Sequence, residues 1–134
     1  YQLLVTGITI FLSTSYMDEA ERAHRVGLLH RGRLMLADTP RAVKASFQGE
    51  LLEARHGNLH KAKQVLTGQP LVQQLLLMGD RLMITVADSA QALGPLQQHL
   101  AQAGLTDVTV KTAAPGLEDV FVQVIGRAET ASRV

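Results

Sequence analysis

The order of hydrophobic patterns between residues 50 and 112 constrains the fold of this chain more than any other feature. Apolar runs predict strands at 50–55, 71–78, 81–87 and 107–112. A segment with helical spacing of its apolar residues follows the first strand, and another follows the third. The chain therefore predicts the element order β-α-β-β-α-β in this region.

This order is that of the split βαβ, or ferredoxin-like, sandwich, so we expect an α/β chain of the α+β type. Local residues set the boundaries of the elements. Asn58 is placed to cap the first helix, and Gly79-Asp80 joins the two central strands. The second helix is expected to be firm only from Pro95 and to end at Gly104.

The C-terminal segment predicts one more helix. Leu117, Val120, Phe121 and Val124 recur at helical spacing, and we expect them to dock on a neighbouring element. The tail at 127–134 is expected to be loose.

The N-terminal segment contains the junction that matters most for function. GITIFL, residues 7–12, has no polar alternation, which predicts a strand buried on both faces. Ser13, Thr14 and Ser15 follow it, and MDEAERAHR, residues 17–25, predicts a helix directly afterwards. Polar residues at a strand-to-helix junction often form sites in α/β domains.

A hairpin and a short helix follow this junction. VGLLH and RLMLAD flank Arg31-Gly32, which predicts two antiparallel strands with a tight turn. Thr39-Pro40 predicts a helix that runs to about Ser46, since threonine caps helices and proline suits the first helical position.

Composition excludes several classes of protein. The 134 residues carry a net charge of +1 and contain no cysteine, so neither a disulfide framework nor a thiolate site is expected. The apolar runs are shorter than the roughly 20 residues of a membrane span, and no basic flank precedes the first one. Because the first residue is Tyr1 rather than Met, we expect a piece of a longer chain.

Three stretches, in this order, resemble the ATP-binding subunit of an ABC transporter, in the branch that powers ABC-2 type exporters. Ser13–Glu21 is similar to the family's H-loop and the helix behind it. Arg25-Val26, Arg31-Gly32-Arg33 and Thr39-Pro40 resemble the hairpin and the turn that follow. Pro115–Phe121 resembles the ending of the family's C-terminal accessory domain.

The resemblance implies a division of the chain. Residues 1–46 would be the C-terminal segment of the nucleotide-binding domain, 47–126 a ferredoxin-like accessory domain for subunit contacts or regulation, and 127–134 a tail. The full-length parent would bind and hydrolyse ATP with Mg²⁺. It would work with an ABC-2 type membrane subunit and a second ATPase subunit, on the cytoplasmic face of the membrane. No nucleic-acid partner is implied.

The chain departs from the family pattern in two ways. It lacks a Walker A loop, a signature motif and an aliphatic run ending in Asp-Glu, so we expect no enzyme activity and no bound cofactor from this chain alone. It also has Ser15 where the family usually has the switch histidine that reaches the γ-phosphate. A serine hydroxyl can donate one hydrogen bond but cannot become cationic. Ser15 is therefore the candidate catalytic and nucleotide-binding residue of the parent.

Each candidate residue also has a structural interpretation. Ser15 could simply cap the following helix. Asp18, Glu19 and Glu21 favour a solvated first turn over a catalytic carboxylate pair. His56 and His60 have the spacing of a metal pair, but Gly57-Asn58 lies between them, which disfavours zinc. A solvated face is the simpler interpretation, and a partner contact the sharper one, of the basic residues Arg22, Arg25, Arg31, Arg33, Arg41 and Lys44.

A second hypothesis is a stand-alone, ferredoxin-like regulatory module that binds a small ligand. The RNA-binding version of this fold is disfavoured, because no aromatic residue lies between Phe47 and Phe121 to stack on bases.

The apolar segment 7–12 also predicts self-association. A strand without its sheet offers unpaired backbone groups to another chain, so we expect this segment to be buried in a contact between copies.

Overall fold

The computed structural model describes residues 4–133 and contains two antiparallel sheets. Tyr1, Gln2, Leu3 and Val134, which the expected N-terminal segment and tail include, lie outside the described residues. The strands are β1 (Val26–His30), β2 (Arg33–Asp38), β3 (Glu50–Arg55), β4 (Val72–Met78), β5 (Arg81–Val86) and β6 (Thr109–Ala113). The helices are the 3₁₀ turn Leu4–Thr6, α1 (Met17–Ala20), α2 (Pro40–Ala45), α3 (Leu59–Leu66), α4 (Ser89–Gln102) and α5 (Leu117–Ser132). This arrangement confirms the expected mixed α/β class.

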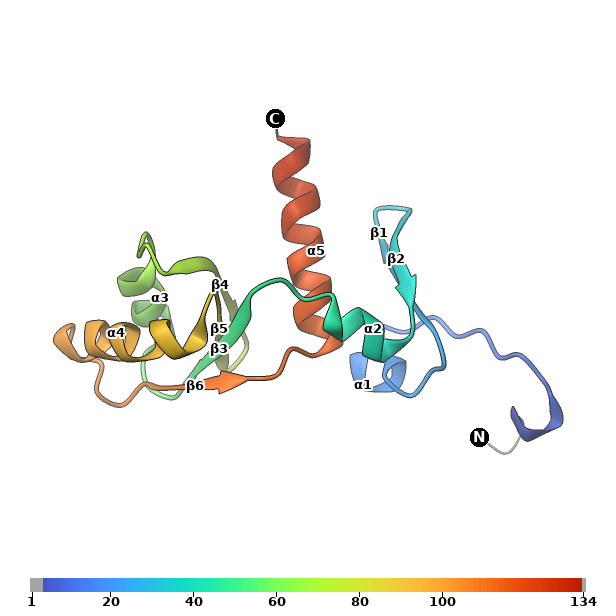
Figure 1. Ribbon diagram of the computed structural model, residues 1–134, viewed down its shortest axis with the longest axis horizontal. Helices are drawn as coiled ribbons and strands as arrows, with labels where there is room; N and C mark the ends of the chain where they lie inside the picture. The colour runs from blue at the N-terminus through green and yellow to red at the C-terminus, as the bar shows by residue number, and fades with distance from the viewer. Residues whose placement is uncertain (1–3, 134) are drawn as a thin grey trace.

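The larger sheet has the strand order β4-β5-β3-β6, and every neighbouring pair is antiparallel. Helices α3 and α4 cover one face of it, and α5 lies on the other side (Figure 1). On the face toward α3 and α4, Leu82, Ile84 and Val86 of β5 are buried. Met83 and Thr85, on the opposite face, are buried as well.

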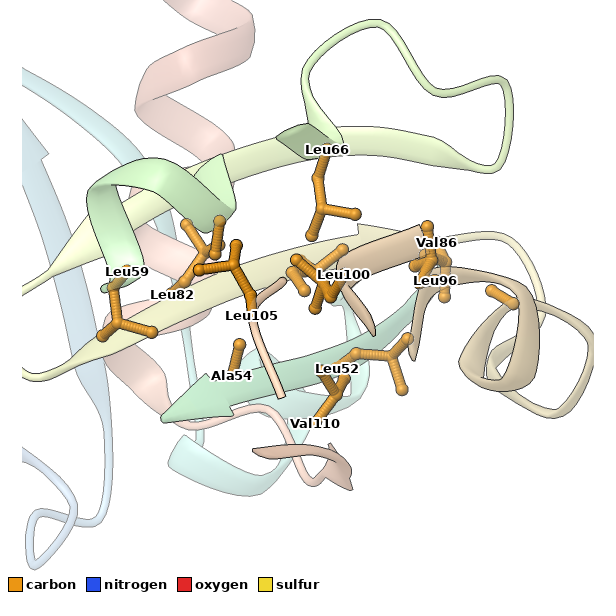
Figure 2. Packing of buried hydrophobic residues seen from close by; sticks show 13 residues of the cluster. Leu52, Ala54, Leu59, Leu66, Leu82, Val86, Leu96, Leu100, Leu105 and Val110 are labelled. Atoms are coloured by element: carbon orange, nitrogen blue, oxygen red, sulfur yellow. The ribbon is translucent and has the colours of Figure 1, made fainter. Parts of the chain in front are cut away.

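The main core lies between this sheet and the two helices α3 and α4 (Figure 2). Each fully buried aliphatic side chain contributes about 1.5–3 kcal/mol to stability, so this cluster is the main source of stability in the region. We call this cluster the sheet core; its buried members are Leu52, Ala54, Leu59, Ala62, Leu66, Leu82, Ile84, Val86, Ala92, Leu96, Leu100, Leu105 and Val110.

A second cluster connects the N-terminal part of the chain with α5. Its buried members are Leu28 on β1, Val43 on α2, and Leu117 and Val120 on α5. We call these four residues the joint cluster. The docking expected for α5 is therefore confirmed, and its neighbours are the hairpin and α2. Figure 1 shows α5 between the larger sheet and the hairpin.

The predicted hairpin turn and two predicted helix caps are confirmed. Arg31 and Gly32 have φ values of 50° and 75°, which suit the tight turn of a twisted hairpin. The Thr39 hydroxyl accepts a hydrogen bond from the Ala42 backbone N–H at 3.2 Å, and α2 begins at the next residue. The Asn58 side chain caps α3 in the same way.

Two predictions in the N-terminal segment are wrong. Residues 7–12 do not form a strand, because none of the strands in the described part of the chain pairs with them. The helix expected over 17–25 ends at Ala20 and continues only as turns. Met17 and Ala20 contact the joint cluster, whereas residues 21–25 are exposed, so no packing stabilises further helix.

Two helices are longer than predicted. Helix α4 begins at Ser89 rather than Pro95, because the Asp88 side chain caps it and Ala92 adds a buried contact to the sheet core. The tail expected to be loose is helical as far as Ser132. In this last part Glu129 lies 3.3 Å from the Arg31 guanidinium.

Candidate functional site at the junction before helix α1

Ser15 lies in a bend between segment 7–12 and α1, and it does not cap this helix. The N-cap is Tyr16, whose side chain makes no capping hydrogen bond. The neighbouring Thr14 organises the turn instead. Its hydroxyl accepts from the Tyr16 backbone N–H at 3.0 Å and donates to the Glu19 carboxylate at 2.7 Å.

The Ser15 side chain is therefore available for other contacts. It is exposed, and its hydroxyl makes no hydrogen bond with any residue between 4 and 133. A free hydroxyl can donate one bond to an anionic oxygen, directly or through water. The structural interpretation of Ser15 as a cap has no support in this geometry.

Of the three acidic residues in and just after α1, Asp18 is exposed, and Glu19 and Glu21 have separate partners. Glu19 accepts the bond from Thr14, and Glu21 lies 3.6 Å from the Lys44 ammonium group. Both ion-pairing side chains of the second contact are substantially exposed, so it contributes about 0–1 kcal/mol. These contacts agree with a solvated first turn.

The basic residues also lie on a solvated surface. Arg31 pairs with Glu129 and Lys44 with Glu21, both in exposed positions. Four further arginines are exposed as well: Arg22, Arg25, Arg33 and Arg41.

The two histidines line an open hollow of about 540 Å³ beside the turn after β3. His56 has a φ of 68° and lies outside α3, whereas His60 lies in its first turn. No group of three metal-ligating side chains occurs among residues 4–133, so the zinc interpretation gains no third ligand. Arg55, in the same hollow, has a pKa raised by its hydrogen bond with Glu53 and by the charges of Glu53 and Asp80.

The sequence interpretation missed a polar network that fixes α5 to the larger sheet. Asp119 is buried, and it accepts from the Arg81 guanidinium at 2.8 Å and from the Gly116 backbone N–H at 2.8 Å. Gln123 exchanges two hydrogen bonds with the backbone of Gln48, at 2.9 and 2.8 Å. An acid three residues after Gly116 was a detectable sign of a helix start, but its partner on β5 was not.

Relatives of known type cover almost the whole chain. It is 32% identical over 93% of its length to the Nod factor export ATP-binding protein I of Rhizobium sp. (strain N33). It is 27% identical over 97% to the probable multidrug ABC transporter ATP-binding protein YbhF of Escherichia coli. It is 26% identical over 92% to the daunorubicin resistance ATP-binding protein DrrA2 of Streptomyces coeruleorubidus.

The chain spans 39%, 22% and 40% of the lengths of these three relatives. No protein-family model matches it. None of the helices between residues 4 and 133 is both long and apolar enough to cross a lipid bilayer. The resemblance carried by Ser13–Glu21 and Pro115–Phe121 is confirmed: over nearly its whole length, the chain is homologous to part of the ATP-binding proteins of ABC transporters.

Proposed function

We propose that the chain is the C-terminal part of the ATP-binding, ATP-hydrolysing subunit of an ABC-2 type exporter. The observation that carries this proposal is the similarity, over at least 92% of the chain, to ATP-binding proteins named for export or drug resistance. The parent would use ATP and Mg²⁺ and would work with a second ATPase subunit and an ABC-2 type membrane subunit. It would lie at the cytoplasmic face of the membrane.

Ser15 is the residue that we assign to the nucleotide. Ser15 is exposed and its hydroxyl makes no hydrogen bond within the described chain, and Thr14 makes the hydrogen bonds of the turn. In the parent, Ser15 would donate a hydrogen bond toward the γ-phosphate, where the family usually has a histidine. The glycine-rich phosphate loop would come from another part of the parent, since this chain has none.

We assign residues 47–126 to a ferredoxin-like accessory domain, with residues 1–46 as part of the nucleotide-binding domain and 127–134 as the end of the chain. The antiparallel order β4-β5-β3-β6, with α3 and α4 on one face, supports this assignment. The joint cluster supports a role in contacts between the two parts, because Leu117 and Val120 pack against Leu28 and Val43.

The extended segment 7–12 would pair with another chain when no partner strand is supplied. Its side chains Ile8, Ile10, Phe11 and Leu12 are all exposed. We expect the 134-residue chain to sediment as a dimer at high micromolar concentration, and Phe11→Lys to shift it toward monomer. A monomeric unmodified chain would contradict this expectation.

Nucleotide binding and turnover test the proposed function. The full-length subunit should hydrolyse Mg-ATP, whereas calorimetric titration of the 134-residue chain should detect no binding at micromolar nucleotide. Micromolar binding by this chain alone would favour a stand-alone nucleotide sensor, and a full-length subunit without turnover would contradict the ATPase assignment.

A small-ligand regulatory module remains the second candidate function. The observation that favours it is an open hollow with a mostly polar lining beside α5.

A further inference from the structure

The second half of α5 and the strands β4 and β5 of the larger sheet line an open hollow of about 550 Å³. This volume lies within the range of small-molecule sites. We call it the polar hollow; its lining residues are Gln73, Gln74, Thr85, Gln123, Gly126, Arg127, Thr130 and Ala131.

Several polar groups around the polar hollow lack partners. The side chains of Gln73, Gln74 and Arg127 make no hydrogen bond or ion pair with any residue in the range 4–133. Thr85 is only 2% exposed, and its hydroxyl has no hydrogen-bond partner among these residues. Buried hydroxyls are normally hydrogen-bonded, and a valine of the same shape would avoid this cost. These groups can therefore serve a molecule that is not part of the chain.

Gly126 allows the glutamine amide to approach the helix closely. A Cβ atom at this position would lie 3.1 Å from the Gln74 amide nitrogen, closer than most real contacts. The glycine thus leaves space for the Gln74 side chain at the rim of the polar hollow. Any larger residue would displace this amide.

The charge of the polar hollow selects the class of ligand. Arg127 is the one ionised side chain among the lining residues, so the hollow attracts an anion. Its guanidinium matches a carboxylate through two parallel hydrogen bonds. Of the three glutamines, Gln123 is already bonded to Gln48. The Gln73 and Gln74 side-chain amides can both donate and accept, which suits an amide on the same molecule.

We propose that the polar hollow binds a small carboxylic acid that also carries an amide or hydroxyl group. The carboxylate would pair with Arg127. The neutral polar group would bond with Gln73, Gln74 and the Thr85 hydroxyl. This site is independent of Ser15 and of nucleotide.

NMR titration of the 134-residue chain with glutaramate tests the proposal, because this probe has a carboxylate at one end and a primary amide at the other. We expect saturable shifts of the Gln73 and Gln74 side-chain amide signals and of the Gly126 backbone signal. The neutral diamide, glutaramide, should bind at least about tenfold more weakly. Absence of saturable shifts at millimolar glutaramate would overturn the proposal.

Three variants separate a specific site from general attraction. Arg127→Gln should weaken binding by about tenfold or more, whereas Arg41→Gln on α2, away from the polar hollow, should leave it unchanged. Thr85→Val should weaken binding while maintaining or raising the melting temperature, since it removes an unpaired buried hydroxyl. Equal losses in the two arginine variants, or full binding by Thr85→Val and Arg127→Gln, would overturn the proposal.

Discussion

Strand β5 and the segment 7–12 begin from the same kind of sequence and end in opposite environments. Both are short and rich in β-branched and aliphatic residues. In β5, Leu82 is 0% exposed between the sheet and its helices, whereas Phe11 in the segment is 95% exposed. A hydrophobic run therefore predicts that a surface has to be covered, and the available neighbouring strands decide whether it is covered within the chain.

The largest expected effect tests this comparison directly. Leu82→Ala should lower the free energy of unfolding by about 4 kcal/mol, since it opens a cavity in the sheet core. Phe11→Ala should change the value for the monomer by less than about 0.5 kcal/mol. Chemical denaturation at a concentration where the chain is monomeric measures both, and similar losses would mean that segment 7–12 is covered in solution.

The polar contact between β5 and α5 should give the next largest effect. Asp119→Asn leaves Arg81 as a largely buried charge, 17% exposed, with a weakened partner. We expect a loss of about 3 kcal/mol, at the lower end for breaking a buried pair because Arg81 retains some solvent. The matched control is Glu118→Gln, because the Glu118 side chain is 55% exposed and its carboxylate lies 4.0 Å from Arg81. It should cost less than about 1 kcal/mol.

Features of this fold that depend on neighbouring residues could be predicted from the sequence, and features that depend on distant residues could not. The hairpin turn at Arg31-Gly32 and the caps at Thr39 and Asn58 depend on a few consecutive residues, and all three are confirmed. The strands of the larger sheet were predictable because each one contains a short apolar run of strand length. The N-cap at Asp88, which accepts from the Gln91 backbone N–H, is also local, although the helix was expected to be firm only from Pro95.

The missing features depend on residues far apart in the chain. Burial of Met83 on the second face of the sheet could not be predicted without knowing that α5 lies there. The pair Arg81–Asp119 joins positions 38 residues apart. At the candidate site, the sequence identified the three hydroxyl residues but not their division of roles, in which Thr14 bonds within the turn and Ser15 does not.

A truncated chain would sharpen the comparison between the two parts of the molecule. A chain that starts at Phe47 should keep its larger sheet, because none of the buried sheet-core residues precedes this position. It should lose the packing of Leu117 and Val120 against Leu28 and Val43, about 1.5–3 kcal/mol for each side chain left exposed. The truncation should therefore accelerate hydrogen exchange more in α5 than in α4. Equal acceleration in both helices would show that the two parts fold as one unit.

Turnover of Mg-ATP by the full-length subunit, with Ser15 replaced, tests the central claim most directly. If Ser15 faces the γ-phosphate, Ser15→His should raise the rate by about ten- to hundredfold, because a hydrogen bond to a charged group is worth about 1.5–3 kcal/mol. Ser15→Ala should lower it without lowering stability, whereas Thr14→Ala should mainly lower stability, since Thr14 makes the structural bonds. Rates unchanged in both Ser15 variants would contradict the assignment of Ser15 to the nucleotide.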